Sequence, residues 1–188
     1  MPGPNLVING SFETPTETQH PNSAPPPGNW GYEKKVPGWQ TNDPDKDFEI
    51  WRDATALPNH PPCYSIAGKQ NLEILAHTPT GSSTTVWQMV KTRQGAAYRF
   101  SFAYTPRPGH RSSLTVAING AKLCTFDVDG TTVPTFNWMR WSVDFIAARS
   151  ATKLSFTDAR HPNGGAGTHI DDVQLRQLTP KPPHLLKF

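Results

Sequence analysis

The stretch Ala97-Tyr-Arg-Phe-Ser-Phe-Ala-Tyr-Thr105 decides the fold class of this chain. Its four aromatic residues occupy every second position, so they share one face of an extended strand, while arginine, serine and alanine share the other. An amphipathic helix would instead repeat its apolar positions with a period near 3.6. The stretch therefore predicts a β-strand with one face in a hydrophobic core.

Strands and turns of the same kind flank this stretch on both sides. Residues 84–90 are rich in the β-branched side chains that strands favour. Residues 114–118 repeat the period of two and lead to Asn119-Gly120, a strong hairpin-turn signal. We expect about ten or eleven short strands and no helix. The main expected strands are 48–51, 72–76, 84–92, 97–105, 114–118, 124–128, 141–145, 154–156 and 168–178, after a short apolar strand that opens the chain at 5–8.

The composition excludes several classes of protein. The 188 residues include 20 Pro and 14 Gly, about 18 % against a typical value of about 12 %. Frequent proline argues against a helical fold, and no apolar run reaches the roughly 18 residues of a membrane span. Six Trp, nine Phe and four Tyr require a core, so the chain is not disordered. Many short strands between turns predict an all-β fold, an antiparallel β-sandwich of jelly-roll type.

The expected domain boundaries follow from where the proline residues gather. Residues 14–29 contain five Pro and almost nothing apolar, which predicts a long loop. Residues 179–188 are again rich in proline and predict a flexible tail or a linker. We therefore expect a single sandwich domain over residues 1–178.

The charge of the chain is nearly balanced outside the tail. The formal net charge is +3, but Lys181 and Lys187 lie in the tail, which leaves 16 basic and 15 acidic residues elsewhere. A domain this neutral lacks the electrostatic footprint of a nucleic-acid-binding protein. We expect no nucleic-acid partner and no membrane insertion.

The cysteines and the first residues of the chain are informative about the cellular compartment of the protein. Cys63 and Cys124 are not a short-spaced pair, so a zinc knuckle or a thioredoxin motif is excluded. A disulfide between distant strands of an exported protein and two separate reduced thiols both stay open. Met1-Pro-Gly-Pro4 has neither the basic nor the apolar region of a signal peptide. Either the protein is not exported by that route, or the sequence begins after the signal.

No catalytic motif is evident. The sequence has no Gly-x-Ser-x-Gly elbow and no phosphate loop, and its seven histidines lack the HExxH spacing. Glu49 and Glu73 are a conceivable carboxylate pair for glycoside cleavage, but any chain with 15 acidic residues offers such pairs. We predict that the protein is not an enzyme.

Two motifs at opposite ends of the chain point to a family. Asn5-Leu-Val-Ile-Asn-Gly-Ser-Phe-Glu13 opens the domain, and His169-Ile-Asp-Asp-Val-Gln-Leu175 closes it. Together they resemble the galactose-binding-like β-sandwich superfamily, and are closest to the cell-wall-associated DUF642 proteins and to carbohydrate-binding modules of the family 4/9/22 type. Motifs such as Val36-Pro-Gly-Trp39 and Trp87-Gln-Met-Val90 follow in the order that such domains use. The resemblance covers approximately residues 5–176.

The resemblance implies a structural calcium ion near the paired termini. Glu13 and Asp171 are the matching carboxylates, and Asn9 and Ser11 offer further oxygens from the turn between them. Asp172 ranks below Asp171, since alternation places Asp171 on one strand face with Val173 and Leu175 and Asp172 on the other. The alternative is that Glu13 and Asp171 only accept hydrogen bonds from backbone groups.

The resemblance also implies a carbohydrate ligand, and sugar sites combine aromatic faces with a few polar groups. The candidate ligand-binding residues are Trp51, Arg52, Trp87, Tyr104, Arg107, His110 and Glu73. The loop 104–111 is the most suggestive, because its prolines limit its mobility beside an aromatic strand. Core packing stays open for Trp51 and Trp87, a solvated basic turn for the loop, and buried pairing for Glu73 and Gln88. The tryptophans that we assign to the core are Trp39, Trp138 and Trp141.

From the sequence we expect a non-catalytic, lectin-like carbohydrate-binding module with a structural calcium, at an extracellular or cell-surface location. A protein-interaction or adhesin module is the alternative, and a glycoside hydrolase ranks behind both. The identity of the sugar and the oligomeric state are not determined by the sequence.

Overall fold

The computed structural model describes residues 3–16, 30–54, 62–74, 83–159, 166–179 and 185–188. These residues form strands and no helix. The strands are β1 (Trp30–Glu33), β2 (Gln40–Thr41), β3 (Phe48–Arg52), β4 (Gln70–Ile74), β5 (Ser83–Lys91), β6 (Ala97–Pro106), β7 (Arg111–Ile118), β8 (Ala121–Asp129), β9 (Met139–Ile146), β10 (Ala151–Ala159), β11 (Thr168–Gln177) and β12 (Leu186–Lys187). Most of the loop predicted at 14–29 and part of the predicted tail lie outside the described residues.

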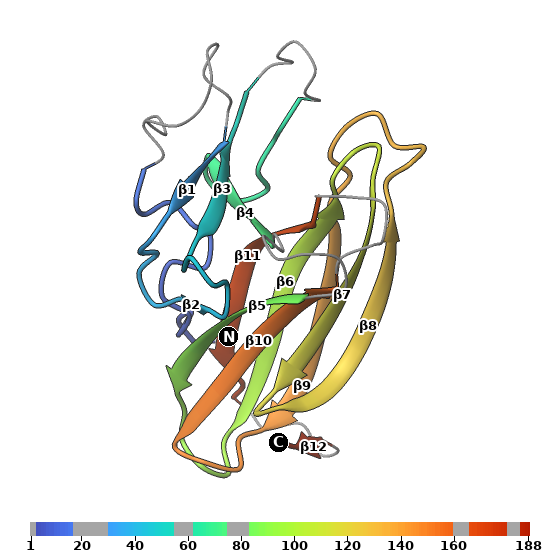
Figure 1. The fold of residues 1–188 in the computed structure, drawn as a ribbon. Coiled ribbons are helices and arrows are strands. Elements are labelled where there is room, and N and C mark those ends of the chain that lie inside the picture. Colours follow the sequence, from blue (N-terminus) through green and yellow to red (C-terminus); the bar gives the residue numbers. More distant parts are fainter. Residues whose placement is uncertain (1–2, 17–29, 55–61, 75–82, 160–165, 180–184) are drawn as a thin grey trace.

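The strands form two sheets that pack face to face (Figure 1). The seven-stranded sheet has the order β1-β3-β4-β11-β6-β9-β12, and the five-stranded sheet has the order β2-β5-β10-β7-β8. All pairings are antiparallel except that of β12 with β9. The predicted all-β, antiparallel sandwich is thus confirmed.

The main core lies between the sheets and uses the alternation seen in the sequence. Tyr98, Phe100, Phe102 and Tyr104 of β6 are all buried in it. Phe156 of β10 meets Phe102 edge to face across the sandwich, with ring centroids 4.9 Å apart. Period-two patterning therefore identified the core face of the central strand correctly.

The opening segment departs from the prediction. The strand expected at 5–8 is reduced to one isolated bridge between Asn5 and Arg176, and a turn follows over residues 8–11. The segment is held by side chains instead, since the Gln88 amide accepts from the backbone N–H of Ile8 at 2.7 Å and donates to its carbonyl at 2.9 Å. Gln88 is therefore buried and paired, which was one of its two expected roles.

The face predicted for Asp171 is wrong because β11 contains a bulge. The register with β6 shifts between Asp171 and Gln174, and Asp172 has a positive φ of 49°. Val173 and Leu175 consequently lie in the core, whereas Asp171 pairs with Ala103 on the outer face of the seven-stranded sheet. One extra residue in a strand moves the residues on either side of it out of phase, so simple alternation assigns one side to the wrong face of the sheet.

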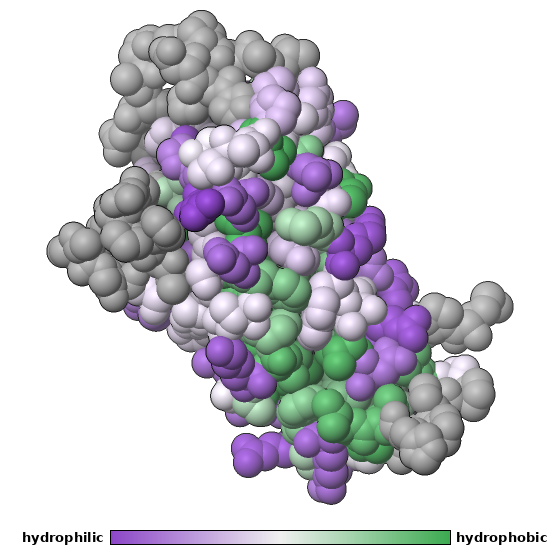
Figure 2. All heavy atoms as spheres, turned by 90° about the vertical axis from the view of Figure 1, so that its right-hand side faces the viewer, coloured by the Kyte–Doolittle hydropathy of each residue, from purple (hydrophilic) through white to green (hydrophobic). Residues whose placement is uncertain are grey.

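Two further features lie along the β8–β9 side of the molecule. Half-buried apolar side chains of these strands pack against the core, and Figure 2, which looks at this side, shows hydrophobic patches on it. Phe188 covers part of the core here, with its ring 6.2 Å from that of Phe145.

Cys63 and Cys124 are both free thiols, so the disulfide alternative does not hold. Within the described residues no helix is long and apolar enough to cross a membrane.

The close approach of the opening turn to the bulge yields a prediction. A Cβ atom on Gly10 would lie 2.1 Å from the carbonyl oxygen of Val173, whose N–H donates to the Gly10 carbonyl. Gly10→Ala should lower the free energy of unfolding by about 2–4 kcal/mol, measured by urea denaturation. Gly3→Ala is the matched control, because its nearest neighbouring atom is 3.5 Å away. Equal stability of the two variants would contradict this packing.

Candidate functional site

The outer face of the seven-stranded sheet carries buried charge at one end. Glu49 of β3 and Glu73 of β4 are paired across the two strands, and His169 of β11 is paired with Glu73 on its other side. Arg107 follows the end of β6 and reaches the same place. We call Glu49, Glu73, Arg107 and His169 the charge cluster.

The two glutamates form a coupled pair of buried carboxyls. Glu49 Oε1 accepts from Trp51 Nε1 at 3.0 Å, and Glu49 Oε2 has no hydrogen-bond partner among the described residues. Burial raises the pKa of Glu49 well above its usual range, and the charge of Glu73 raises it further. Burial also raises the pKa of Glu73, against the opposing effects of Arg107 and of the Gly167 N–H. Burial and the neighbouring charge therefore favour the uncharged form of Glu49, whereas Arg107 and the Gly167 N–H favour the charged form of Glu73.

Glu73 collects the remaining donors of the cluster. The Gly167 N–H donates to its Oε1 at 2.6 Å, and the Arg107 Nη1 lies 3.4 Å from its Oε2. The guanidinium of Arg107 also lies 4.8 Å from the centroid of the Trp51 ring. Only 18 % of the Arg107 side chain is exposed, so this arginine covers the carboxyl pair.

His169 is a neutral member of the cluster. Burial lowers its pKa well below the usual range, and Arg107 lowers it further. Its Nδ1 lies 2.8 Å from Asn71 Oδ1, and the Asn71 amide nitrogen donates elsewhere, so we assign the proton to Nδ1. Its Nε2 lies 3.6 Å from Glu73 Oε2.

A row of aromatic rings lies alongside the charge cluster. It consists of Trp30, Trp51, Phe136 and Trp138, and we call it the aromatic row. Successive ring centroids are 6.2, 6.3 and 6.2 Å apart. The two middle residues are buried, whereas Trp30 and Trp138 at its ends are half-buried. The Nε1 of Trp138 donates to the carbonyl of Tyr64, and half of Tyr64 is exposed.

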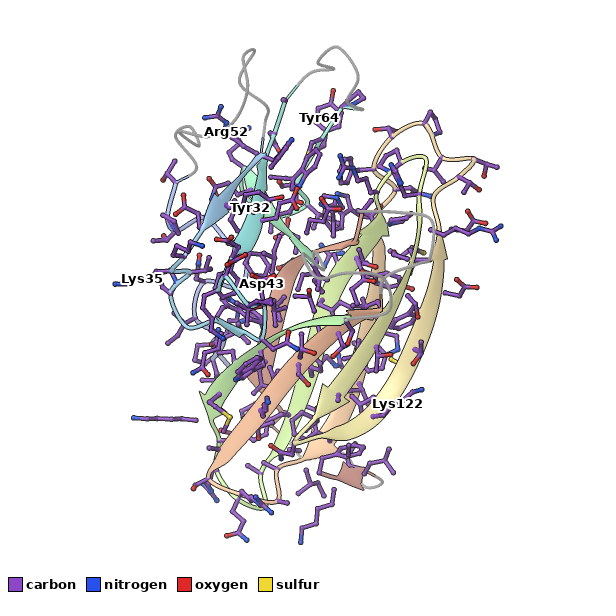
Figure 3. All side chains as sticks on the ribbon, in the orientation of Figure 1. Tyr32, Lys35, Asp43, Arg52, Tyr64 and Lys122 are labelled. Carbon is purple, nitrogen blue, oxygen red and sulfur yellow. The ribbon has the colours of Figure 1, made fainter. Side chains whose placement is uncertain are left out.

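Three of the predicted ligand residues meet in this region. Trp51 and Glu73 lie in the interior of the row and the cluster, fully buried, and Arg107 covers them. Arg52 is exposed, and Figure 3 places it at the same end of the molecule as Tyr64. The predicted residues thus converge on one region, but the two most buried ones support the surface and do not form it.

The other three predicted ligand residues lie elsewhere. Tyr104 is buried between the sheets, with its ring 4.6 Å from that of Phe126, so it is a core residue. His110 is exposed in the turn between β6 and β7. Trp87 lies on the outer face of the five-stranded sheet, under the Lys153 ammonium at 4.4 Å. It lines a pocket of about 370 Å³.

Sequence reasoning missed part of this region. Trp30 was not placed, and Trp138, assigned to the core, is half-buried at an end of the aromatic row. The missing signal was the strand β1, whose register sets Trp30 opposite Trp51. Recognising alternation over Trp30–Glu33 would have placed Trp30 and Tyr32 beside the glutamates.

The carboxylates of Glu13 and Asp171 both accept hydrogen bonds from the backbone of residues 66–70. Glu13 Oε1 accepts the N–H groups of Lys69 and Gln70 at 2.9 and 2.8 Å. Asp171 Oδ2 accepts those of Ile66 and Ala67, each at 2.9 Å, and burial raises its pKa to about 7.

The remaining members of the predicted metal set are the turn residues. The Asn9 amide exchanges hydrogen bonds with Thr14, and its carbonyl accepts from Trp39. Ser11 is half-buried. Among the described residues, only Oε1 of the Glu13 carboxylate accepts hydrogen bonds. The Asp171 carboxylate accepts three N–H groups. Glu13 is therefore the carboxylate with more acceptor capacity left for a metal ion.

The raised pKa values of Glu49 and Glu73 make stability depend on pH. A carboxyl with a raised folded-state pKa contributes stability that is lost as the pH rises, so stability should fall as the pH rises above the ordinary glutamate pKa. In Glu49→Gln, Oε1 still accepts from Trp51 and the side chain carries no charge at any pH. We expect on the order of 1 kcal/mol more stability at pH 8 and a weaker decline from pH 5 to 8, measured by urea denaturation.

The exposed Asp127→Asn on β8 is the control, and it should follow the wild type at every pH. Part of the decline should persist in both variants, because burial raises the pKa of Asp158 and of Asp171 to about 7. A loss of stability in Glu49→Gln at pH 8 would contradict a raised pKa of Glu49.

Known structures share this fold at low identity. TmCBM61, a carbohydrate-binding module solved in complex with β-1,4-galactotriose, aligns with a TM-score of 0.56 and 18 % identity, over 94 % of this chain and 100 % of that one. An arabinose-bound GH51 α-L-arabinofuranosidase aligns with a TM-score of 0.53 and 13 % identity, over 92 % of this chain and 26 % of that one. The active domain of tailspike protein 4 of bacteriophage CBA120 gives 0.50 and 13 %, over 93 % and 21 %.

These likenesses show the β-sandwich fold. No curated protein sequence matches the chain. The family described as a protein of unknown function, DUF642, matches residues 67–176, which is more than half of the chain. The predicted resemblance is confirmed, and the chain belongs to the DUF642 family.

Proposed function

We propose that this protein is a carbohydrate-binding module that recognises glycans without cleaving them, through the exposed ends of the aromatic row. The observation that carries the proposal is the juxtaposition of Trp30, Trp138 and Tyr64 with Arg107 and the buried carboxyls. Aromatic faces accept the apolar side of a pyranose, and a few fixed polar groups bond its hydroxyls.

The rigidity of the region supports binding. Arg107 is held by an ion pair to Glu73 and by the face of Trp51, so it loses little freedom when a ligand arrives. Trp138 is fixed by its hydrogen bond to the Tyr64 carbonyl. The likeness to a module solved with a galactotriose supports the same class of ligand.

The charge cluster favours binding over catalysis. A retaining glycosidase holds its two carboxyls about 5 Å apart and an inverting one about 6.5–9.5 Å apart, on either side of the scissile bond. Glu49 and Glu73 instead face each other on neighbouring strands and are buried. Such a pair supports the surface above it and leaves no room for a sugar between the carboxyls.

A structural calcium at Glu13 and Asp171 is also part of the proposal. The two carboxylates are brought to one backbone segment, and carboxylates are ligands that calcium prefers. Asn9 and Ser11 are neighbours in the adjoining turn. The ion would add a cross-link between the two ends of the domain. An extracellular or cell-surface location suits both a glycan ligand and calcium.

One observation favours the alternative of a protein-interaction or adhesin module. Apolar side chains of β8 and β9 are only half-buried, and Figure 2 shows hydrophobic patches on the side of the molecule that it faces. Extended apolar surface is typical of protein contacts. Glycan binding at the aromatic row would leave this surface for a partner.

The proposed site is tested by ligand binding. Calorimetry with a panel of polysaccharides and with β-1,4-galactotriose should find a ligand that the wild type binds. Trp138→Ala and Tyr64→Ala should each weaken that binding by about tenfold or more. Circular dichroism checks that both variants are folded, and Tyr64, being half exposed, carries little risk of misfolding.

Trp87→Ala is the matched control, since it removes a tryptophan from the outer face of the other sheet. It should bind as the wild type does. Loss of binding in Trp87→Ala alone would move the site to that face, and no binding at millimolar glycan would refute the proposed function.

The proposed terminal calcium is tested by thermal unfolding. Calcium at about 100 times its Kd should add about 2.7 kcal/mol of stability, and chelation should remove it. Glu13→Gln keeps Oε1 as the acceptor for Lys69 and Gln70 but lowers the charge of the site. This variant should respond less to calcium than the wild type does, and an unchanged response would refute a terminal site.

A further inference from the structure

The loop that joins the two sheets near the start of the domain carries three aspartates. It connects β2 of the five-stranded sheet to β3 of the seven-stranded sheet. Asp43, Asp45 and Asp47 alternate along it, and one carboxylate oxygen of each lies within 4.8 Å of the others. This loop is separate from the terminal carboxylates and from the aromatic row.

Asp43 is the unusual member of the group. Only 1 % of the residue is exposed, although its Oδ1 accepts the N–H groups of Asp45 and Asp47 at 3.0 and 3.2 Å. Its Oδ2 is buried and has no hydrogen-bond partner among the described residues. A buried carboxylate oxygen without a donor is costly, which indicates that a cation completes it.

A lysine partly neutralises the loop. The Lys34 Nζ lies 2.8 Å from Asp47 Oδ1 and donates to the Asp45 carbonyl at 2.8 Å. The pKa of Lys34 is raised, mainly by its hydrogen bond to Asp47. One ammonium therefore faces three carboxylates, and the contacts of Lys34 are with Asp47 and the Asp45 carbonyl rather than with Asp43 Oδ2.

We propose that Asp43, Asp45 and Asp47 bind a calcium ion, with the Asp45 carbonyl as a further ligand. All the donors are hard oxygens, which suit calcium, and a flexible coordination number accommodates a loop. The ion occupies the place that Lys34 now shares, so Lys34 and calcium compete. All the proposed ligands belong to this one loop, so the bound ion fixes the conformation of the connection between β2 and β3.

Calcium titration of the full chain by calorimetry tests this site. Asp43→Asn keeps Oδ1 as the acceptor for the two N–H groups and removes half of the buried carboxylate. Asp45→Asn changes an exposed side chain, so it does not threaten the fold. Each variant should lose one calcium-binding event or weaken it by at least about tenfold, while Glu13→Gln should leave this event intact.

Removing the competing lysine gives a result of the opposite sign. Lys34→Met should tighten calcium binding several-fold, since Asp47 is then free for the ion. Lys35→Met is the matched control: it removes the same charge one residue away, from a side chain that points outward from the body in Figure 3. It should leave the affinity nearly unchanged, apart from a small long-range effect.

Two results would overturn the site. One is an equal number of bound calcium ions and equal affinities in the wild type, Asp43→Asn and Asp45→Asn. The other is an equal gain in affinity in Lys34→Met and Lys35→Met, which would show only a general effect of charge. Failure of the terminal site would appear separately, as an unchanged response in Glu13→Gln.

Discussion

The burial of two facing carboxyls, Glu49 and Glu73, is the constraint on which the end of the protein with the proposed site depends. Water does not reach them, so the folded chain must supply hydrogen-bond donors. It supplies Trp51 Nε1 to Glu49, and the Gly167 N–H and the Arg107 guanidinium to Glu73. Each of these donors comes from a different segment, so satisfying the pair also fixes where β6 ends and where β11 begins.

The position of the aromatic row depends on the same buried carboxyls and their donors. Trp51 donates to Glu49 through Nε1 at 3.0 Å and presents its face to Arg107, so its ring has one orientation. Trp30 and Phe136 pack on it, and Trp138 extends the row to the surface. The proposed sugar-binding surface would be preorganised, because the polar groups beneath it leave the rings little freedom. In that proposal the buried acids hold the rings in position and do not contact the ligand.

The sandwich itself is joined at its ends by polar groups as well as by its core. Gln88 bonds the opening turn to the five-stranded sheet, while Gly10 meets the bulge of β11 in the seven-stranded sheet. The aspartate loop after β2 makes a third connection between the sheets.

The sequence by itself determined the fold class, the core face of β6 and the family, because alternation and the terminal motifs are local patterns that packing preserves. The sequence also indicated Trp51, Glu73 and Arg107 as candidate ligand-binding residues, but it did not predict how far each of them is buried. Only the tertiary structure decided that Asp171 faces outward and that Trp30 joins Trp51. These outcomes depend on strand order, on register and on one bulge in β11, and each is set by contacts between residues far apart in the chain.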